Sequence, residues 1–195
     1  MGIVGATERE VNRRAGAGAL AGGQEAEQLV VFQLGQELYG VDIGGVNTII
    51  RMQGITRVPQ APEFVEGVTN LRGSTIPVID LRQRLGLGAH EERKSSRIVA
   101  IESRLGLVGL IVDAVTEIRS VPRDAVEPPS SLVTAADSHC LRGVAKLDDK
   151  LVIMLDLEQI FTETEHEVLG ELSKAEVEAE AEAAAEAAAT VGAGV

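Results

Sequence analysis

Asp80 and Asp156 occupy equivalent places in the sequence, and their pairing could do acid–base chemistry. Two carboxylates that share a proton form the catalytic unit of aspartic proteases. Each aspartate, however, ends an apolar run and has a glutamine three residues later, Gln83 and Gln159. That is the spacing of a helix capping box, in which the aspartate accepts hydrogen bonds from first-turn amides. We therefore predict that Asp80 and Asp156 are structural caps, each at the start of a helix.

The other side chains able to do chemistry do not form a recognisable set. His139 and Cys140 are adjacent, and the remaining histidines are His90 and His166. This is not the spacing of zinc ligands. The serines lack a Gly-x-Ser-x-Gly elbow, and no Gly-x-x-x-x-Gly-Lys-Ser/Thr phosphate loop occurs. We expect no catalytic residue, no metal site and no cofactor.

Composition excludes several further classes of function. The 195 residues include 18 Lys or Arg and 30 Asp or Glu, for a net charge of −12. Three Phe, one Tyr and no Trp offer few stacking surfaces for bases, and the acidic balance disfavours a phosphate backbone. A single cysteine forms no internal disulfide, and no apolar run reaches the roughly 18 residues of a membrane span. We expect a soluble, cytoplasmic protein that neither binds nucleic acid nor inserts into the membrane.

The elements that must position these residues are short strands between residues 28 and 162. Six segments are rich in β-branched residues, are four to eight residues long, and are bounded by Gly, Pro, Asp or Ser. They are 28–35, 37–43, 75–79, 97–101, 106–112 and 150–155. Val46, Ile49 and Ile50 recur at helical spacing and predict one short helix after the second strand. The density of strands is typical of barrels or a sandwich.

The strand region contains an internal duplication. Shifting the chain by 69 positions aligns its first part with its later part, and after seven extra residues the offset becomes 76. Two similar units follow, about 28–94 and 95–162. Gly67 aligns with Gly143, which predicts a positive φ or a close approach of two backbones. Each unit is marginal for a core of its own, so we expect the two to pack together, with a partner-binding groove between them.

The two ends of the chain differ from the middle. Residues 1–27 are rich in Gly and Ala without a strand or helix period, which indicates a flexible arm. Residues 163–195 hold nine acidic residues and one basic residue, a local charge of −8. Their Ala and Glu content favours a solvated helix or a disordered tail. Binding of this tail to a basic surface is the alternative.

Residues 67–82 contain the remaining motif, with Asn70 and Arg72 at a tight connection. In the second unit Asp148 stands in the place of Arg72. Arg72 is either a solvated turn residue or an interface anchor, because arginine is enriched at binding hot spots.

At these residues the chain resembles the CheW-type chemotaxis coupling proteins. The run Gly-Val-Thr-Asn-Leu-Arg-Gly-x-x-x-Pro-Val-Ile-Asp-Leu-Arg at 67–82 is similar to the hallmark of that family. The segment 39–43, followed by Val46 and Ile49, is similar to its earlier signature. The resemblance covers residues 28–162. It implies an all-β fold with short helices, made of two pseudo-symmetric five-stranded SH3-like β-barrels packed together.

The resemblance also implies a function. It predicts a non-enzymatic adaptor that joins the cytoplasmic tips of methyl-accepting chemoreceptors to the regulatory domain of the histidine kinase CheA in membrane-attached arrays. The receptor-binding groove would be formed by Val46, Ile49, Gly67, Asn70 and Arg72. Two alternatives stay open at this point: a coupling protein of a twitching or biofilm pathway, and a hydrolase that uses the two aspartates.

Overall fold

The computed structural model describes residues 26–104, 106–129, 140–147, 150–165 and 167–171. Strands dominate these residues, which confirms the all-β class expected from the sequence. In chain order the elements are β1 (Ala26–Leu34), β2 (Glu37–Asp42), η1 (Ile43–Gly45), β3 (Val46–Arg51), β4 (Val65–Leu71), β5 (Ser74–Asp80), α2 (Leu81–Arg84), β6 (Arg97–Ser103), β7 (Gly106–Val112), β8 (Ala114–Pro122), η2 (Arg123–Ala125), β9 (Val126–Glu127), β10 (Leu141–Leu147) and β11 (Lys150–Leu155). The arm before residue 26, the tail after residue 171, and His139, Asp148, Asp149 and His166 lie outside the described residues.

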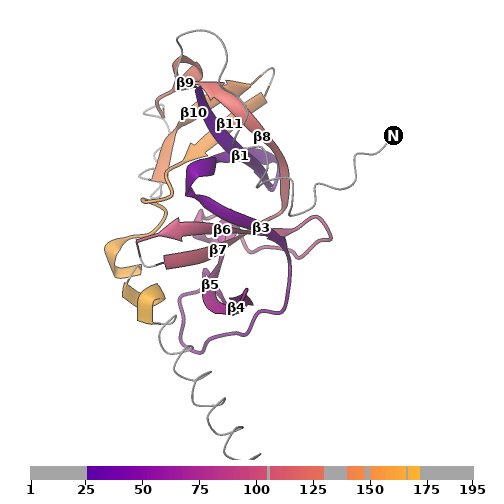
Figure 1. Ribbon diagram of the computed structural model, residues 1–195, viewed down its shortest axis with the longest axis vertical. Coiled ribbons are helices and arrows are strands. Elements are labelled where there is room, and N and C mark those ends of the chain that lie inside the picture. The colour runs from indigo at the N-terminus through magenta and orange to yellow at the C-terminus, as the bar shows by residue number, and fades with distance from the viewer. Residues whose placement is uncertain (1–25, 105, 130–139, 148–149, 166, 172–195) are drawn as a thin grey trace, which may run out of the picture.

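Two sheets follow one another along the long axis of the molecule (Figure 1). The upper sheet has six strands in the order β8-β1-β2-β11-β10-β9, and the lower sheet has five in the order β3-β6-β7-β5-β4. The sixth strand of the upper sheet is β9, a two-residue element that pairs with β10. Pairing is antiparallel except between β2 and β11 and between β5 and β7.

Each sheet contains strands of both sequence units. By the alignment of the two units, β1, β2 and β3 correspond to β6, β7 and β8, and β4 and β5 correspond to β10 and β11. In the upper sheet β1 and β2 pair with strands of the second unit, and in the lower sheet β6 and β7 pair with strands of the first. Strands of the two units meet in the antiparallel pairs β1–β8 and β3–β6 and in the parallel pairs β2–β11 and β5–β7. A single unit would leave these joins unpaired, so the two units depend on each other for folding.

Alternation along the central strands divides the buried side chains among three clusters. On β1, Val30 and Phe32 belong to the central cluster shared by both sheets, while Leu29 and Val31 belong to the core of the six-stranded sheet. The equivalent strand β6 divides its residues in the same way between the central cluster and the core of the five-stranded sheet. Strands buried on both faces explain why their sequences are continuous apolar runs.

The helix expected at Val46, Ile49 and Ile50 is wrong, because these residues form strand β3. β3 pairs with β6, and its register shifts between Val46 and Thr48. An extra residue at such a bulge breaks the period of two. It lets Val46 and Ile49, three positions apart, both pack on the central cluster, while Ile50 joins the other core. The bulge therefore produced the spacing that resembled a helix.

Helices have a minor part in this fold. α2 contains four residues, η1 and η2 contain three each, and residues 163–165 and 167–171 are also helical. Leu169 is buried in the central cluster, so the expectation that the chain is solvated from residue 163 onward is wrong for this part of it. None of the helices in the described part of the chain has the length and apolar character needed to cross a membrane.

Candidate partner-binding surface

Gly67 on β4 lies where a second backbone segment meets the strand. Its φ is +150°, and a Cβ at this position would lie 2.1 Å from the carbonyl oxygen of Thr56. Thr56 and Val68 exchange two backbone hydrogen bonds of 2.8 Å beside it. At Gly143, a Cβ would lie 2.7 Å from the carbonyl oxygen of Glu127. The expected close approach of two backbones is confirmed at both glycines.

Arg72 and Gly73 form the two-residue turn between β4 and β5. Both have positive φ, +55° and +90°, as a type I′ hairpin turn requires. The Asn70 side-chain oxygen accepts a hydrogen bond of 2.9 Å from the Gly73 amide and so fixes the turn from within. Arg72 is exposed, and its backbone is in a region that costs a non-glycine residue about 1 kcal/mol or more.

Residues 52–56, here called the strap, join the two edges of the five-stranded sheet. The Gln53 side-chain amide donates to Thr69 Oγ1 at 2.8 Å and to the Asn70 carbonyl at 2.7 Å. Thr69 Oγ1 donates to the Gly54 carbonyl at 2.7 Å. The strap therefore runs from the end of β3 across to β4, which lies at the other edge of the sheet.

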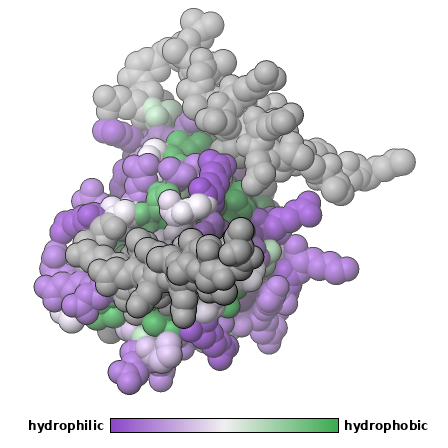
Figure 2. All heavy atoms as spheres, turned by 60° about the horizontal axis from the view of Figure 1, so that its bottom comes forward, coloured by the Kyte–Doolittle hydropathy of each residue, from purple (hydrophilic) through white to green (hydrophobic). Residues whose placement is uncertain are grey.

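The five predicted groove residues fall into two groups. Gly67, Asn70 and Arg72 lie together on β4 and its turn, whereas Val46 and Ile49 lie on β3 at the opposite edge. Val46 and Ile49 are half-buried and pack on the central cluster. On the visible part of the end that carries this sheet, hydrophilic side chains predominate and hydrophobic ones show in small patches between them (Figure 2). Such a face favours recognition by polar anchors combined with limited apolar contact.

Asp80 is buried and is the N-cap of α2. Its Oδ1 accepts from the amides of Arg82 at 3.0 Å and Gln83 at 3.2 Å, and its Oδ2 accepts from the His90 amide at 2.7 Å. The Asp80 amide donates to the Phe64 carbonyl, so the glutamine side chain cannot close a reciprocal capping box. Every described contact of this carboxylate is structural.

Asp156 lies in a turn, and the helix expected after it is absent from residues 157–161. Its Oδ1 accepts from the Glu158 amide and its Oδ2 from the Gln159 side chain, both at 3.0 Å. The chain turns here because Ile160 and Phe161 enter the central cluster in succession. Asp80 ends β5 of one sheet, Asp156 directly follows β11 of the other, and the two share no hydrogen bond. Among the residues that the structure describes, no three His, Cys, Asp or Glu side chains gather as a metal site.

Asp113 organises a buried polar network that the sequence did not reveal. Its Oδ2 accepts from the Gly35 amide at 2.6 Å and from Arg82 at 3.3 Å, and its Oδ1 lies 3.3 Å from His90 Nδ1. The network ties the β1–β2 turn of one sheet to α2 and the segment leading to β6 of the other. Asp113 directly follows the apolar run of β7. A charged residue at that place in the sequence is the signal from which a buried polar residue could have been predicted.

An ion pair closes the six-stranded sheet. Arg142 on β10 donates two hydrogen bonds to Glu27 on β1, one of them 2.8 Å long. The two strands are not neighbours in the sheet, so the pair bridges its open side. These hydrogen bonds, reinforced by the positive charge of Arg142, hold the pKa of the Glu27 carboxyl below its ordinary value of 4.5.

Residues 28–165 match the family model described as CheW-like domain. The chain belongs to the CheW family. A chemotaxis protein CheW from Treponema pallidum is 32% identical over 157 residues, which cover 78% of this chain and 92% of the relative. One from Helicobacter pylori is 33% identical over 138 residues, which cover 70% and 82%. The crystal structure of the scaffolding protein TtCheW from Thermoanaerobacter tengcongensis is similar with a TM-score of 0.66 at 41% identity, covering 75% of this chain and 94% of that one.

Membership of the CheW family confirms the resemblance found at residues 67–82. It makes the chain a non-enzymatic scaffold of chemotaxis signalling. The alternative of an aspartate-dependent hydrolase is overturned by the same findings, and the separate structural contacts of Asp80 and Asp156 agree with this.

Proposed function

We propose that the chain couples the cytoplasmic tips of methyl-accepting chemoreceptors to the regulatory domain of the histidine kinase CheA. It would act in the cytoplasm, recruited to membrane-attached receptor arrays. Membership of the CheW family supports a chemotaxis scaffold. The β4–β5 turn supports the more specific assignment of a receptor contact.

The positive φ and the exposure of Arg72 are the observations that support the receptor site. Asn or Gly at this turn position would fit the positive φ at lower cost, yet the turn holds an exposed arginine. No hydrogen bond or ion pair of its side chain occurs within the described residues. A guanidinium presented from a fixed turn offers fork-like hydrogen bonds to carboxylates or carbonyls of a partner. Local strain that a conformation retains is typical of functional positions.

Val46 and Ile49 supply the apolar part of the proposed receptor contact. Both are half-buried on β3, at the edge of the five-stranded sheet. Their inner surfaces pack on the central cluster, and their outer surfaces are available to the apolar face of a receptor helix. Gly67 and Asn70 shape the opposite edge by holding the strap and the turn.

The kinase contact is assigned to strand edges and barrel faces. β8 and β9 are the edges of one sheet, and β3 and β4 are those of the other. Edge strands offer backbone groups and hydrophobic rims for pairing with another domain. Because the two sheets have corresponding strand orders, a regulatory domain of the same fold could meet either of them in a pseudo-symmetric way.

Titration of a receptor-tip fragment into three full-length proteins tests the receptor site. Arg72→Asn removes the guanidinium while suiting the positive φ, so binding should weaken at least about tenfold without loss of stability. Arg104→Asn is the control for loss of an exposed arginine of the same sheet, because Arg104 lies in the β6–β7 connection, where it pairs with Glu163 at 2.8 Å. Equal affinity of Arg72→Asn and wild type for the fragment would remove Arg72 from the site.

A further inference from the structure

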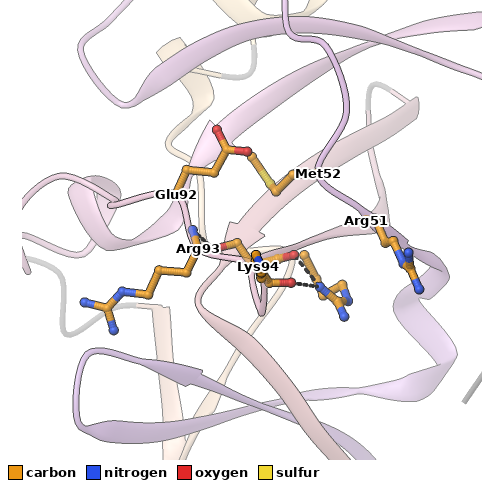
Figure 3. A pocket seen from close by; sticks show the side chains of 7 residues that line it. Arg51, Met52, Glu92, Arg93 and Lys94 are labelled. Carbon is orange, nitrogen blue, oxygen red and sulfur yellow. Dashed lines mark hydrogen bonds between the residues drawn. The ribbon is translucent and has the colours of Figure 1, made fainter. Parts of the chain in front are cut away.

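A basic depression lies on the five-stranded sheet, away from the β4–β5 turn. It has a volume of about 680 Å³ and is lined by Arg51, Met52, Glu92, Arg93, Lys94, Ser96 and Arg97. In the view of Figure 3, Lys94 lies between Arg51 on one side and Arg93 on the other. Four cations and one carboxylate line this depression in a protein whose net charge is −12.

The positive charge of the depression is only partly balanced by nearby carboxylates. Arg51 and Arg97 are directly paired across β3 and β6, an arrangement in which like charges repel. Arg97 donates to the backbone carbonyls of Lys94 at 3.0 Å and Ser96 at 2.7 Å, which fix its position but carry no net charge. Arg93 is paired with Glu91 at 3.1 Å, whereas Arg51, Lys94 and Arg97 have no carboxylate within ion-pair distance in the part of the chain that the structure describes.

The loop that carries these cations is held in place before any ligand arrives. The His90 amide is bound by the buried Asp80, and the Ser96 amide donates to the Arg93 carbonyl at 2.9 Å. The Arg93 amide in turn donates to Ser96 Oγ, and Ser96 is 1% exposed. A loop held in one conformation, with Lys94 and Arg97 beside Arg51 and none of the three in an ion pair among the described residues, is suited to an anionic segment, because little backbone ordering is needed on binding.

The chain itself carries an anionic segment long enough to reach the depression. Residues 172–195 contain five glutamates and one lysine, a local charge of −4. At about 3.3 Å per residue they could extend about 80 Å, twice the diameter of about 40 Å for a domain of this size. Tethering would supply an effective concentration in the millimolar range.

We propose that the acidic segment 172–195 docks within the same molecule on the basic depression formed by Arg51, Arg93, Lys94 and Arg97. The docked segment covers this part of the five-stranded sheet and must be displaced by any other anionic partner that uses it. This inference does not depend on the assignment of the receptor site to Arg72.

Paramagnetic relaxation in the full-length protein tests this docking. A spin label is attached through Ala188→Cys; Cys140 is 1% exposed, and unsubstituted protein carried through the labelling shows whether Cys140 reacts. We expect the amide signals of residues 92–97 to lose at least half their intensity and to recover in about 0.5 M salt. Reversing two charges of the depression, Arg51→Glu with Lys94→Glu, should restore the same signals.

The matched control reverses two exposed cations of the six-stranded sheet, Lys146→Glu with Lys150→Glu, and should leave the effect intact. Three results would overturn the proposal. The first is an unchanged or evenly weakened spectrum. The second is an effect that appears only when labelled and isotope-enriched molecules are mixed, which would assign the depression to a second copy. The third is binding of an added polyglutamate peptide at residues 92–97 with no effect from the tethered label, which would assign it to an external acidic partner.

Discussion

The five-stranded and six-stranded sheets have corresponding strand orders but are closed by different chemistry. The five-stranded sheet is closed by the strap, whose Gln53 makes neutral hydrogen bonds to β4. The six-stranded sheet is bridged by the Glu27–Arg142 ion pair and extended by β9. Their strand-end aspartates also differ, since Asp80 is buried in a network and Asp156 lies in a more exposed turn. The two sheets therefore share their strand order but differ in the contacts that close them and in their turns. The parts that differ include the residues proposed to bind a partner.

The largest difference between the sheets is expected at their equivalent glycines. Gly67→Ala places a Cβ 2.1 Å from the Thr56 carbonyl oxygen at a positive φ, so we expect a loss of at least about 3 kcal/mol. Gly143→Ala meets the Glu127 carbonyl oxygen at 2.7 Å without a positive φ, and should cost about 1 to 2 kcal/mol. Urea unfolding measures both. Equal losses would show that the two sheets close with the same tightness.

The capping aspartates should differ next. In Asp80→Asn, an amide nitrogen replaces one buried oxygen, and a backbone donor loses its acceptor. We expect a loss of about 2 kcal/mol. Asp156→Asn changes a more exposed turn and should cost less than about 1 kcal/mol. Thermal unfolding, with receptor-fragment binding as a second readout, checks this. Loss of binding by folded Asp80→Asn would show that the carboxylate does more than cap.

Acid should remove the stabilisation that the Glu27–Arg142 ion pair gives the six-stranded sheet. It should not change the stabilisation that the strap gives the five-stranded sheet. Because the pKa of Glu27 is lowered in the folded state, its contribution is complete above 4.5 and is lost as the pH falls through the lowered value. Glu27→Gln should therefore cost about 1 kcal/mol near neutral pH, a modest value because Arg142 is 40% exposed, and nothing near pH 2.

Gln53→Ala provides the comparison for that pH dependence. It should cost about 1 kcal/mol at every pH in this range, because neither partner of its hydrogen bonds titrates. Unfolding free energies of both variants, measured against wild type from acid to neutral pH, give the result. A constant cost for Glu27→Gln would show that the ion pair does not contribute through its charge.

The smallest expected change in stability is at the β4–β5 turn, and it has the opposite sign. Arg72→Asn suits the φ of +55° and should raise the free energy of unfolding by up to about 1 kcal/mol. Arg72→Ala, which keeps the strain, should leave it within about 0.5 kcal/mol. A clear loss of stability in both variants would show that the arginine side chain supports the fold.

The fold class and family could be predicted from the sequence because their signals are local. Continuous apolar runs mark β6 and β7, and the motif at 67–82 lies in one segment. Strand exchange could not be predicted in this way, because an apolar run shows that a strand is buried but not which strand lies beside it. β2 and β11 are neighbours although more than one hundred residues separate them.

The candidate site was predicted in part. The need for glycine at 67 and 143 is encoded by their recurrence in the duplication, and the close approaches explain it. The relative placement of Val46 and Arg72 on opposite edges depends on the strap, whose side-chain bonds have no periodic signature. Asp113 was missed because its partners include Gly35, 78 residues away. Contacts between residues so far apart in the sequence depend on the order of the strands in the fold, which local sequence patterns do not show.

Simultaneous binding of two partners tests the proposed function most directly. Full-length protein is mixed with saturating receptor-tip fragment and CheA regulatory domain, and the complexes are sized by analytical ultracentrifugation. We predict one complex that contains all three. For Arg72→Asn we predict a complex that keeps the kinase domain and needs at least about tenfold more receptor fragment to become filled. Mutual exclusion of the two partners on the wild-type chain would contradict a coupling function.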